Sequence, residues 1–421
     1  MLRQFWRALT AFLLVVSAAH AQSALTWEQV RERFRANNPN LAASRVAVDE
    51  SKAQEITAYL RPNPDFTLST DGTQLTPYQG VWRPFAGTQF SPSVSYLHER
   101  EQKRELRRDS ARGATAIAGS TLDDQERTLM FTLRNAFVQT LQAKAVLQLA
   151  RDNLSYYDRV LEVNRTRQQA GDIAQVDLDR LELQRVQYES DVQTALVSLR
   201  TAKIQVLTLL NDRTPVEQFD VTGDFNFADQ LMPLEEFRAS ALDTRPDLRA
   251  ALQAIDKAKT DHQLAMANGS ADPTFSGWWT HNPSFNNPFD FNTIGASVSI
   301  PLRIHDKNQG EKLRTQLDIT RSQSLADANR AQVFSDVDSA YATIAGNLAL
   351  LRPYRDRYLQ QAARVRDTVS FAYQNGGASL LDFLNAQSDY RNVNLNYLHL
   401  IGAYMTTAGQ MNLAVGKEVI P

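Results

Sequence analysis

The chain has 421 residues, of which 43% are hydrophobic, so it can bury a core of ordinary size. Its 45 basic residues nearly balance its 47 acidic ones, and no Lys/Arg-rich tract stands apart from compensating acids. This balance argues against nucleic acid as a partner. The chain has no cysteine, which excludes disulfides, zinc–thiolate sites, thiol catalysis and a lipid-modified N-terminal cysteine.

The first 21 residues have the parts of a secretory signal peptide. Basic residues precede an apolar run over residues 8–16, and a small-x-small cleavage motif ends at Ala21. We therefore expect export, with residues 1–21 removed and a mature chain that begins at Gln22. A membrane anchor is the alternative, but the run is too short to span a bilayer. No later segment has about 20 consecutive apolar residues, so any membrane crossing must be made by strands.

Residues 129–210 predict a long helical hairpin that reverses direction at Gly171. Small and apolar residues recur at alternating four- and three-residue steps on both sides of this glycine, which is typical of an antiparallel coiled-coil seam. Arg185 is the one misfit. The expected seam is Leu129, Leu133, Ala136, Thr140, Ala143, Leu147, Ala150, Leu154, Tyr157, Leu161, Ala174, Leu178, Leu181, Tyr188, Val192, Ala195, Leu199, Ala202, Val206 and Leu209.

The hairpin occurs twice, because the sequence around the tip at residues 170–178 aligns with residues 375–383. The chain is thus a tandem duplication, and we expect both halves to act in a quasi-symmetric way. The predicted parts are a first repeat (22–211, hairpin about 101–211), a connecting segment (212–233), a second repeat (234–416, hairpin about 306–416, tip at Gly376) and a tail (417–421).

Four short segments alternate between apolar and polar residues, at about 64–71, 88–97, 273–281 and 291–300. This alternation, with aromatic residues near the ends, is typical of outer-membrane barrel strands, although strands of soluble sandwiches alternate too. Four strands cannot close a barrel, and an open sheet edge is not tolerated in lipid. Several chains must therefore pool their strands if these cross a membrane. We expect the serines to face the lumen and the aliphatic residues the lipid: Ser93, Ser95, Ser297 and Ser299 against Val94, Val298 and Ile300.

The sequence predicts no enzyme, no metal site and no cofactor. Its six histidines are scattered, and none has a partner at metal-ligand spacing. No Ser-His-Asp order, glycine-rich phosphate loop or pair of carboxylates on a strand–loop scaffold is present.

Acidic residues recur at the two hairpin tips. Asp177 and Asp382 each lie six residues beyond a tip glycine, and Tyr373 lies three residues before Gly376. One interpretation is that each aspartate caps a helix and offsets its dipole. The other is functional, because the same residue type recurs at the tip in both halves.

At these residues the chain resembles the outer-membrane efflux protein family, of which TolC is the best-known member. The resemblance covers essentially the whole mature chain and rests on both tips and on the paired openings Asn38-Pro39-Asn40-Leu41 and Arg245-Pro246-Asp247-Leu248. It also includes the strand exit Val298-Ser299-Ile300-Pro301-Leu302. The first tip, residues 169–173, is similar to the heavy-metal-efflux branch typified by CzcC and CusC.

The resemblance implies a mainly α fold with a small transmembrane β part. Three copies would form a homotrimer, with twelve pooled strands in one outer-membrane barrel and twelve helices in a tunnel through the periplasm. Asp177, Tyr373 and Asp382 match positions at the constriction that closes the tunnel. We expect Asp382 carboxylates to converge at the axis and Asp177 to accept a hydrogen bond from a neighbour. The chain departs from the drug-efflux pattern at Ala378 and Asn385, where that pattern has an arginine and an acidic residue.

The resemblance further implies a passive export duct in a tripartite efflux system, in the outer membrane of a Gram-negative-type cell. A periplasmic adaptor would dock on the hairpin tips, at Gly171, Asp172, Gly376 and Gly377, and an inner-membrane RND-type pump would supply energy. Gln22 implies that the mature protein is not lipidated. Two alternatives remain at this stage: the outer-membrane component of a type I protein secretion system, and a periplasmic coiled-coil scaffold without a pore.

Overall fold

The computed structural model describes residues 24–77, 79–85, 87–282 and 291–420. The predicted signal peptide lies outside these residues. The chain forms two compact units. The hairpin unit comprises the described residues up to Ser44, Asp124–Arg245 and Gln332 onward, and the sheet unit comprises Arg45–Asp123 and Pro246–Ala331. Each unit therefore takes segments from both predicted repeats.

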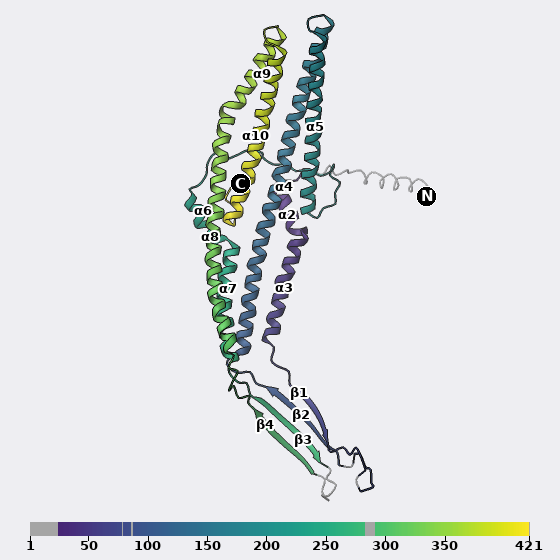
Figure 1. Ribbon diagram of the computed structural model, residues 1–421, viewed down its shortest axis with the longest axis vertical. Helices are drawn as coiled ribbons and strands as arrows, with labels where there is room; N and C mark the ends of the chain where they lie inside the picture. The colour runs from purple at the N-terminus through teal and green to yellow at the C-terminus, as the bar shows by residue number, and fades with distance from the viewer. Residues whose placement is uncertain (1–23, 78, 86, 283–290, 421) are drawn as a thin grey trace, which may run out of the picture. The chain divides into compact units, whose positions relative to one another are not determined.

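The sheet unit contains one antiparallel sheet with strand order β1-β2-β3-β4 (Figure 1). Its strands are β1 (Asp65–Asp71), β2 (Gln89–Leu97), β3 (Thr274–Asn282) and β4 (Phe291–Ser299). These bounds agree with the predicted segments to within one residue at each end. The two central strands come from different repeats, with Val94 opposite Gly277 and Tyr96 opposite Phe275. The duplicated halves thus build one continuous sheet, whose edges are β1 and β4.

The strand register separates the serines from the aliphatic residues. Val94 lies opposite Phe66, and Val298 lies opposite Phe275, on one face. The predicted serines alternate with these residues and therefore occupy the other face. Ile300 lies one residue beyond the end of β4, so the strand register assigns it to neither face.

Trp278 breaks the polar pattern of the serine face. It pairs with Gly295 on the adjacent strand, on the same face as Ser93. A Cβ atom at residue 295 would collide with the indole of Trp278. The glycine therefore leaves the space that the large ring occupies.

A buried ion pair ties the two repeats together where the chain leaves the sheet. The Lys103 ammonium donates to the Asp272 carboxylate at 2.6 Å and to the Ser270 carbonyl at 2.9 Å, and the Lys103 side chain is only 4% exposed. The Arg100 backbone N–H donates to the other oxygen of Asp272 at 2.9 Å. The carboxylate thus fixes the start of one long helix against the segment that enters β3.

The hairpin unit contains the tip-bearing parts of the two predicted hairpins, side by side (Figure 1). Thr26 and Gln29 form a capping box at the first helix. The helices are α2 (Trp27–Asn37), α3 (Pro39–Tyr59), α4 (Lys103–Gln169), α5 (Gln175–Leu209), α6 (Leu234–Thr244), α7 (Pro246–Asn268), α8 (Gln309–Pro353), η1 (Tyr354–Tyr358), α9 (Leu359–Gln374) and α10 (Leu380–Val415). Of these, α7 belongs to the sheet unit, while α3, α4 and α8 contribute to both units.

The heptad seam of the first hairpin is largely buried, as predicted. Fully buried members include Leu133, Thr140, Tyr157, Leu181 and Val206. Ala174 is exposed because it precedes the first turn of α5, so its place in the seam is wrong. The misfit Arg185 pairs with Asp158 across the hairpin at 2.6 Å and with Glu189 along α5. A charged seam position is thus accommodated by partners on both helices.

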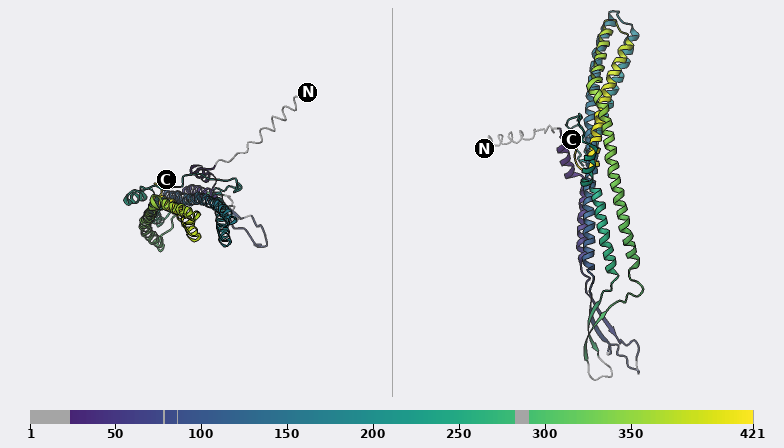
Figure 2. Two further views of the ribbon diagram at one scale, coloured as in Figure 1. Left: turned by 90° about the horizontal axis from the view of Figure 1, so that it is seen from above. Right: turned by 90° about the vertical axis from the view of Figure 1, so that its left-hand side faces the viewer.

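The connecting segment of residues 212–233 lies with α2 on one side of the hairpin helices (Figure 2). A single parallel bridge joins Leu25 to Val221. The Asp220 carboxylate receives the ammonium groups of Lys144 at 2.8 Å and Lys203 at 3.2 Å, one from each helix of the first hairpin. Among the described residues, no helix combines the length and the apolar composition needed to cross a membrane.

We predict that Lys103→Met destabilises the protein by about 2–3 kcal/mol, because the Asp272 carboxylate and the Ser270 carbonyl lose a buried donor. Urea unfolding in detergent, followed by tryptophan fluorescence, measures this change. The control is Lys52→Met, since the Lys52–Asp49 pair is 61% and 70% exposed. It should cost less than about 0.5 kcal/mol. Equal effects of the two substitutions would contradict the conclusion that the buried Lys103–Asp272 ion pair stabilises the fold.

Candidate functional site at the hairpin tips

Both tips turn on a glycine in the left-handed region. The φ angle is 83° at Gly171 and 76° at Gly376, a conformation that costs a residue with a Cβ atom. The next backbone N–H closes the turn in each case, from Asp172 to Arg167 O at 2.9 Å and from Gly377 to Ala372 O at 2.8 Å. The tips are therefore built alike, with the geometry that commonly ends a helix at a glycine.

The two aspartates occupy the same helical position but make different contacts. Asp382 is the third residue of α10 and completes a capping box with Ser379, whose hydroxyl and backbone N–H donate to its carboxylate at 2.7 and 3.2 Å. The hydroxyl hydrogen bond lowers the pKa of Asp382. Asp177 is the third residue of α5, but Ala174 offers no side-chain cap, and Arg180 lies 3.7 Å away. A side-chain cap thus forms at Asp382 and not at Asp177, while both carboxylates lie in the first turn of their helix.

Tyr373 lies between the two hairpins. Its side chain is buried, and its hydroxyl donates to the Oδ1 atom of Asn164 at 3.1 Å. The ring stacks on Phe383 with 5.0 Å between centroids, and the Arg167 guanidinium lies over it at 5.6 Å. Burial raises the pKa of Tyr373, so the phenol stays protonated at neutral pH. The phenol therefore joins the first hairpin to the second within one chain.

Asn164 was not predicted as a site residue. It is 1% exposed, and its amide also donates to Val160 O at 2.8 Å. It falls three residues after Leu161, at the next step of the heptad seam. A polar residue at a seam position often fixes the pairing of coiled-coil helices, so the interruption of the apolar pattern was the available signal.

Further polar contacts tie the hairpins together farther from the tips. The Tyr156 hydroxyl donates to Ser370 Oγ at 3.1 Å, and the Gln387 amide donates to the same oxygen at 3.2 Å. The Arg391 guanidinium pairs with Asp191 at 3.0 Å. Helices α4, α9 and α10 thus meet around Ser370, and α5 joins α10 through the ion pair.

A hollow of about 410 Å³ lies between α9 and α10, directly below the second tip. Two carboxylates and an amide line it among small apolar residues. Its lining is Val365, Thr368, Val369, Ala372, Gly377, Ala378, Asp382, Asn385, Ala386 and Asp389. Residue 378, next to the tip glycines, is an alanine, and no basic side chain lines this hollow. The two carboxylates therefore make the electrostatic potential in the hollow negative.

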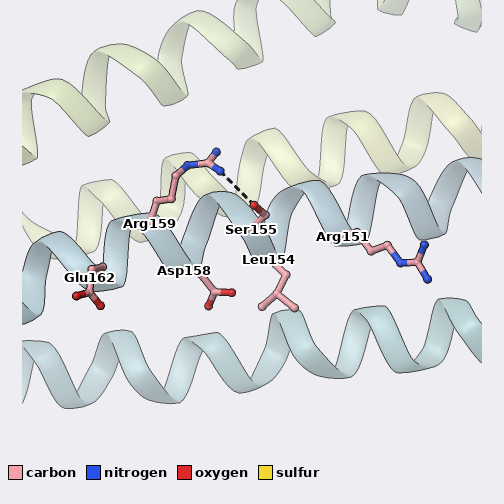
Figure 3. Close-up of a pocket in the computed structure, with 6 residues that line it drawn as sticks. All are labelled: Arg151, Leu154, Ser155, Asp158, Arg159 and Glu162. Carbon is pink, nitrogen blue, oxygen red and sulfur yellow. Dashed lines mark hydrogen bonds between the residues drawn. The ribbon is translucent and has the colours of Figure 1, made fainter.

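A second hollow, on α4, does not form a binding site (Figure 3). Its lining residues Arg151, Leu154, Ser155, Asp158, Arg159 and Glu162 all come from one helix. Arg159 donates to Ser155 at 3.1 Å, and Asp158 is taken by Arg185. The polar groups thus point apart or pair with residues outside the hollow, and they do not converge on a common point. Within the described residues, no three His, Cys, Asp or Glu side chains gather closely enough to hold a metal ion.

The outer membrane efflux protein family matches residues 30–212 and 238–417, one match in each half of the chain. The chain belongs to this family. The predicted resemblance is therefore confirmed, and the relatives are outer-membrane efflux channels rather than enzymes.

Two relatives show how far the similarity extends. The chain is 21% identical to the cobalt-zinc-cadmium resistance protein CzcC of Cupriavidus metallidurans, over 96% of this chain and 93% of that protein. It is 26% identical to the pyoverdine export outer membrane protein OpmQ of Pseudomonas putida, over 86% and 79%. The crystal structure of CusC matches with a TM-score of 0.77 at 16% identity, over 93% of this chain and 92% of that one. The predicted TolC-like fold of the chain is thus confirmed.

We predict that Tyr373→Phe loosens the contact between the hairpins, because the buried Oδ1 atom of Asn164 loses its donor. The cost should be about 1–2 kcal/mol, or roughly a 5- to 30-fold rise in hydrogen exchange near residues 160–168 and 370–376. Exchange measured by mass spectrometry tests this.

The double substitution Tyr373→Phe with Asn164→Leu should recover much of the lost protection, because it leaves neither polar partner buried alone. Tyr59→Phe, at a 41% exposed tyrosine of the sheet unit, is the control and should leave the tips unchanged. If the double variant exchanges as fast as the single one, the hydrogen bond is not what holds this contact.

Proposed function

We propose that the protein is the outer-membrane channel of a tripartite efflux system, a passive duct through which an inner-membrane pump expels its substrate. The observation that supports this most strongly is the sheet. It has one face with Val94 and Val298, an opposite face with serines, and two edges at β1 and β4. A sheet with free edges cannot remain in lipid unless other chains complete it.

Three copies would join β4 of one chain to β1 of the next and close a twelve-stranded barrel in the outer membrane. Closure gives every strand two neighbours and leaves the serine face toward an aqueous lumen. The long hairpins would then form the periplasmic part of the duct. A periplasmic adaptor would dock at Gly171, Asp172, Gly376 and Gly377, where the two tips present equivalent turns.

The gate in this proposal consists of Asp177, Tyr373 and Asp382. Tyr373 fixes the second hairpin against the first within each chain, through Asn164. Asp382 borders the hollow between α9 and α10, and three copies of it would surround the axis. Three carboxylates at such a constriction attract cations and repel one another, so they would favour cation passage.

Metal cations and small organic solutes are both compatible with this duct. CzcC is a cobalt-zinc-cadmium resistance protein and OpmQ exports pyoverdine, so the named relatives do not single out one substrate. The carboxylates at the second tip, without an arginine at residue 378, favour a cationic substrate over an anionic one.

Planar lipid bilayers test the proposal directly. The purified mature protein should be a trimer in detergent by light scattering, and it should insert to give discrete single-channel currents. A stable monomer, or a trimer that never conducts, would contradict the channel and favour a scaffold without a pore.

We predict opposite effects of the two tip aspartates in such bilayers. Asp177→Ala should raise the conductance by about twofold, because in the proposed trimer it removes an acceptor for a hydrogen bond from a neighbour. Asp382→Ala should mainly lower the cation selectivity and the block by divalent ions, on the order of twofold, because it removes charge from the constriction. Asp179→Ala, two residues beyond Asp177 on an exposed face of α5, is the matched control and should change neither. Unchanged currents in all three variants would leave the aspartates as helix-terminal residues without a gating role.

A further inference from the structure

The second hairpin contains a break that the first hairpin lacks. Pro353 ends α8 and is followed by the single π-turn η1, after which the helix continues as α9. Proline has no N–H to donate and its ring crowds the carbonyl four residues earlier, so the regular ladder is interrupted there. A π-turn within an α-helix is a common cause of a kink and occurs frequently at functional sites. The corresponding helix α4 runs through 67 residues without a proline.

The connecting segment contacts the second hairpin at this break. The Asp229 carboxylate pairs with Arg355 inside the π-turn and with Arg352 at 3.4 Å, immediately before Pro353. The backbone carbonyl of Asp229 accepts a second hydrogen bond from Arg352 at 2.8 Å. One residue therefore holds arginines on both sides of the proline.

The same short segment, residues 227–229, also contacts the returning helix. The Tyr404 hydroxyl on α10 lies 3.3 Å from both the nitrogen and the oxygen of Ala228. Phe227 packs edge-on against Tyr404 with 6.0 Å between ring centroids, and the Arg355 guanidinium lies 5.1 Å from the centre of the Phe227 ring. We call residues 227–229 the clasp, because they contact both helices of the second hairpin at the level of the π-turn.

The charged side chains of the clasp and of its partners are largely exposed to solvent. The side chains of Arg352, Arg355 and Asp229 are 51%, 41% and 42% exposed. Exposed ion pairs are weak and weaken further as salt is added. Contacts of this kind add little to a hydrophobic core, but they can be broken and re-formed at little cost. The contact of the clasp with Tyr404 is different, because this side chain is buried, with 4% exposure, and stays in place when the ion pairs break.

We propose that the π-turn is the bending point of the second hairpin, and that Asp229 is a positioning residue that holds the bend. Release of Asp229 frees α9 and the second tip, with Tyr373 and Asp382, to move against the first hairpin. The first hairpin keeps its course, because its own contact at Asp220 lies on helices without a break. The consequence for conduction rests on the proposed channel function, whereas the hinge itself does not.

Asp229→Asn in the full-length mature protein tests the hinge. The amide keeps the shape of the side chain but loses the charge that pairs with Arg352 and Arg355. Hydrogen exchange of residues 350–360, measured in detergent, should rise by about two- to fivefold, and added salt should raise it in the wild type as well. Single-channel conductance is measured on the same variants.

Three further variants distinguish a specific role of Asp229 at the π-turn from a general destabilisation of the second hairpin. Asp229→Glu retains the carboxylate and should restore most of the protection. Asp356→Asn removes another partner of Arg355, at 2.8 Å, that does not reach the clasp, and it should leave exchange near the wild-type rate. Asp220→Asn frees the other end of the connecting segment and should leave residues 350–360 unchanged.

Faster exchange in Asp229→Asn with a changed conductance supports the proposal in full. Unchanged exchange, or equally fast exchange in Asp356→Asn, overturns the hinge whether or not the protein conducts. Faster exchange with an unchanged conductance overturns the link from hinge to gate. A wild-type protein that forms no channel would refute the proposed function, and the exchange measurements would still decide whether the clasp holds the bend.

Discussion

Backbone hydrogen bonding at the edges of the sheet is the constraint on which the rest of this protein depends. The strand order leaves β1 and β4 each with one neighbour. Every N–H and C=O along their outer sides needs a partner wherever water is absent. The described chain offers no fifth strand. A second copy is the simplest source of a partner, because β1 and β4 of identical chains can pair edge to edge around a closed ring.

The duplication gives the chain an approximate internal symmetry, and the structure shows where this symmetry is kept. The central strands β2 and β3 come from different repeats, and the tips share the same glycine turn and closing hydrogen bond. The aspartates after the tips also share one helical position. These are features of backbone conformation and register, which two copies of one ancestral segment would retain together.

Periodicity and turn chemistry predicted most of the fold, since both are local. The heptad steps located the seam, the period-two alternation located the strands, and the glycines located the tips. The sequence alone did not predict which polar residues meet across hundreds of positions. Tyr373 and Asn164 are 209 residues apart, and nothing near either one specifies the other. The π-turn was missed for a different reason, because Pro353 could equally have ended the helix. Trp278 departs from the polar pattern of the serine face because the space that its ring needs is provided by Gly295 on a neighbouring strand.

The differences between the repeats concentrate in the second hairpin. They concern how its returning helix is capped and whether its outgoing helix is continuous. Ser379 caps α10 where Ala174 leaves α5 without a side-chain cap, so the second tip has the better-anchored returning helix. The outgoing helix of the same hairpin carries the π-turn, at which we propose that it bends. A well-capped tip that lies beyond a bending point can move as a rigid body. A poorly capped tip on an unbroken helix would instead unfold locally. The negative hollow below the second tip lies on the piece that would move. In the proposed channel, the carboxylate-lined hollow would thus lie on the hairpin that can bend, with the unbroken first hairpin as its support.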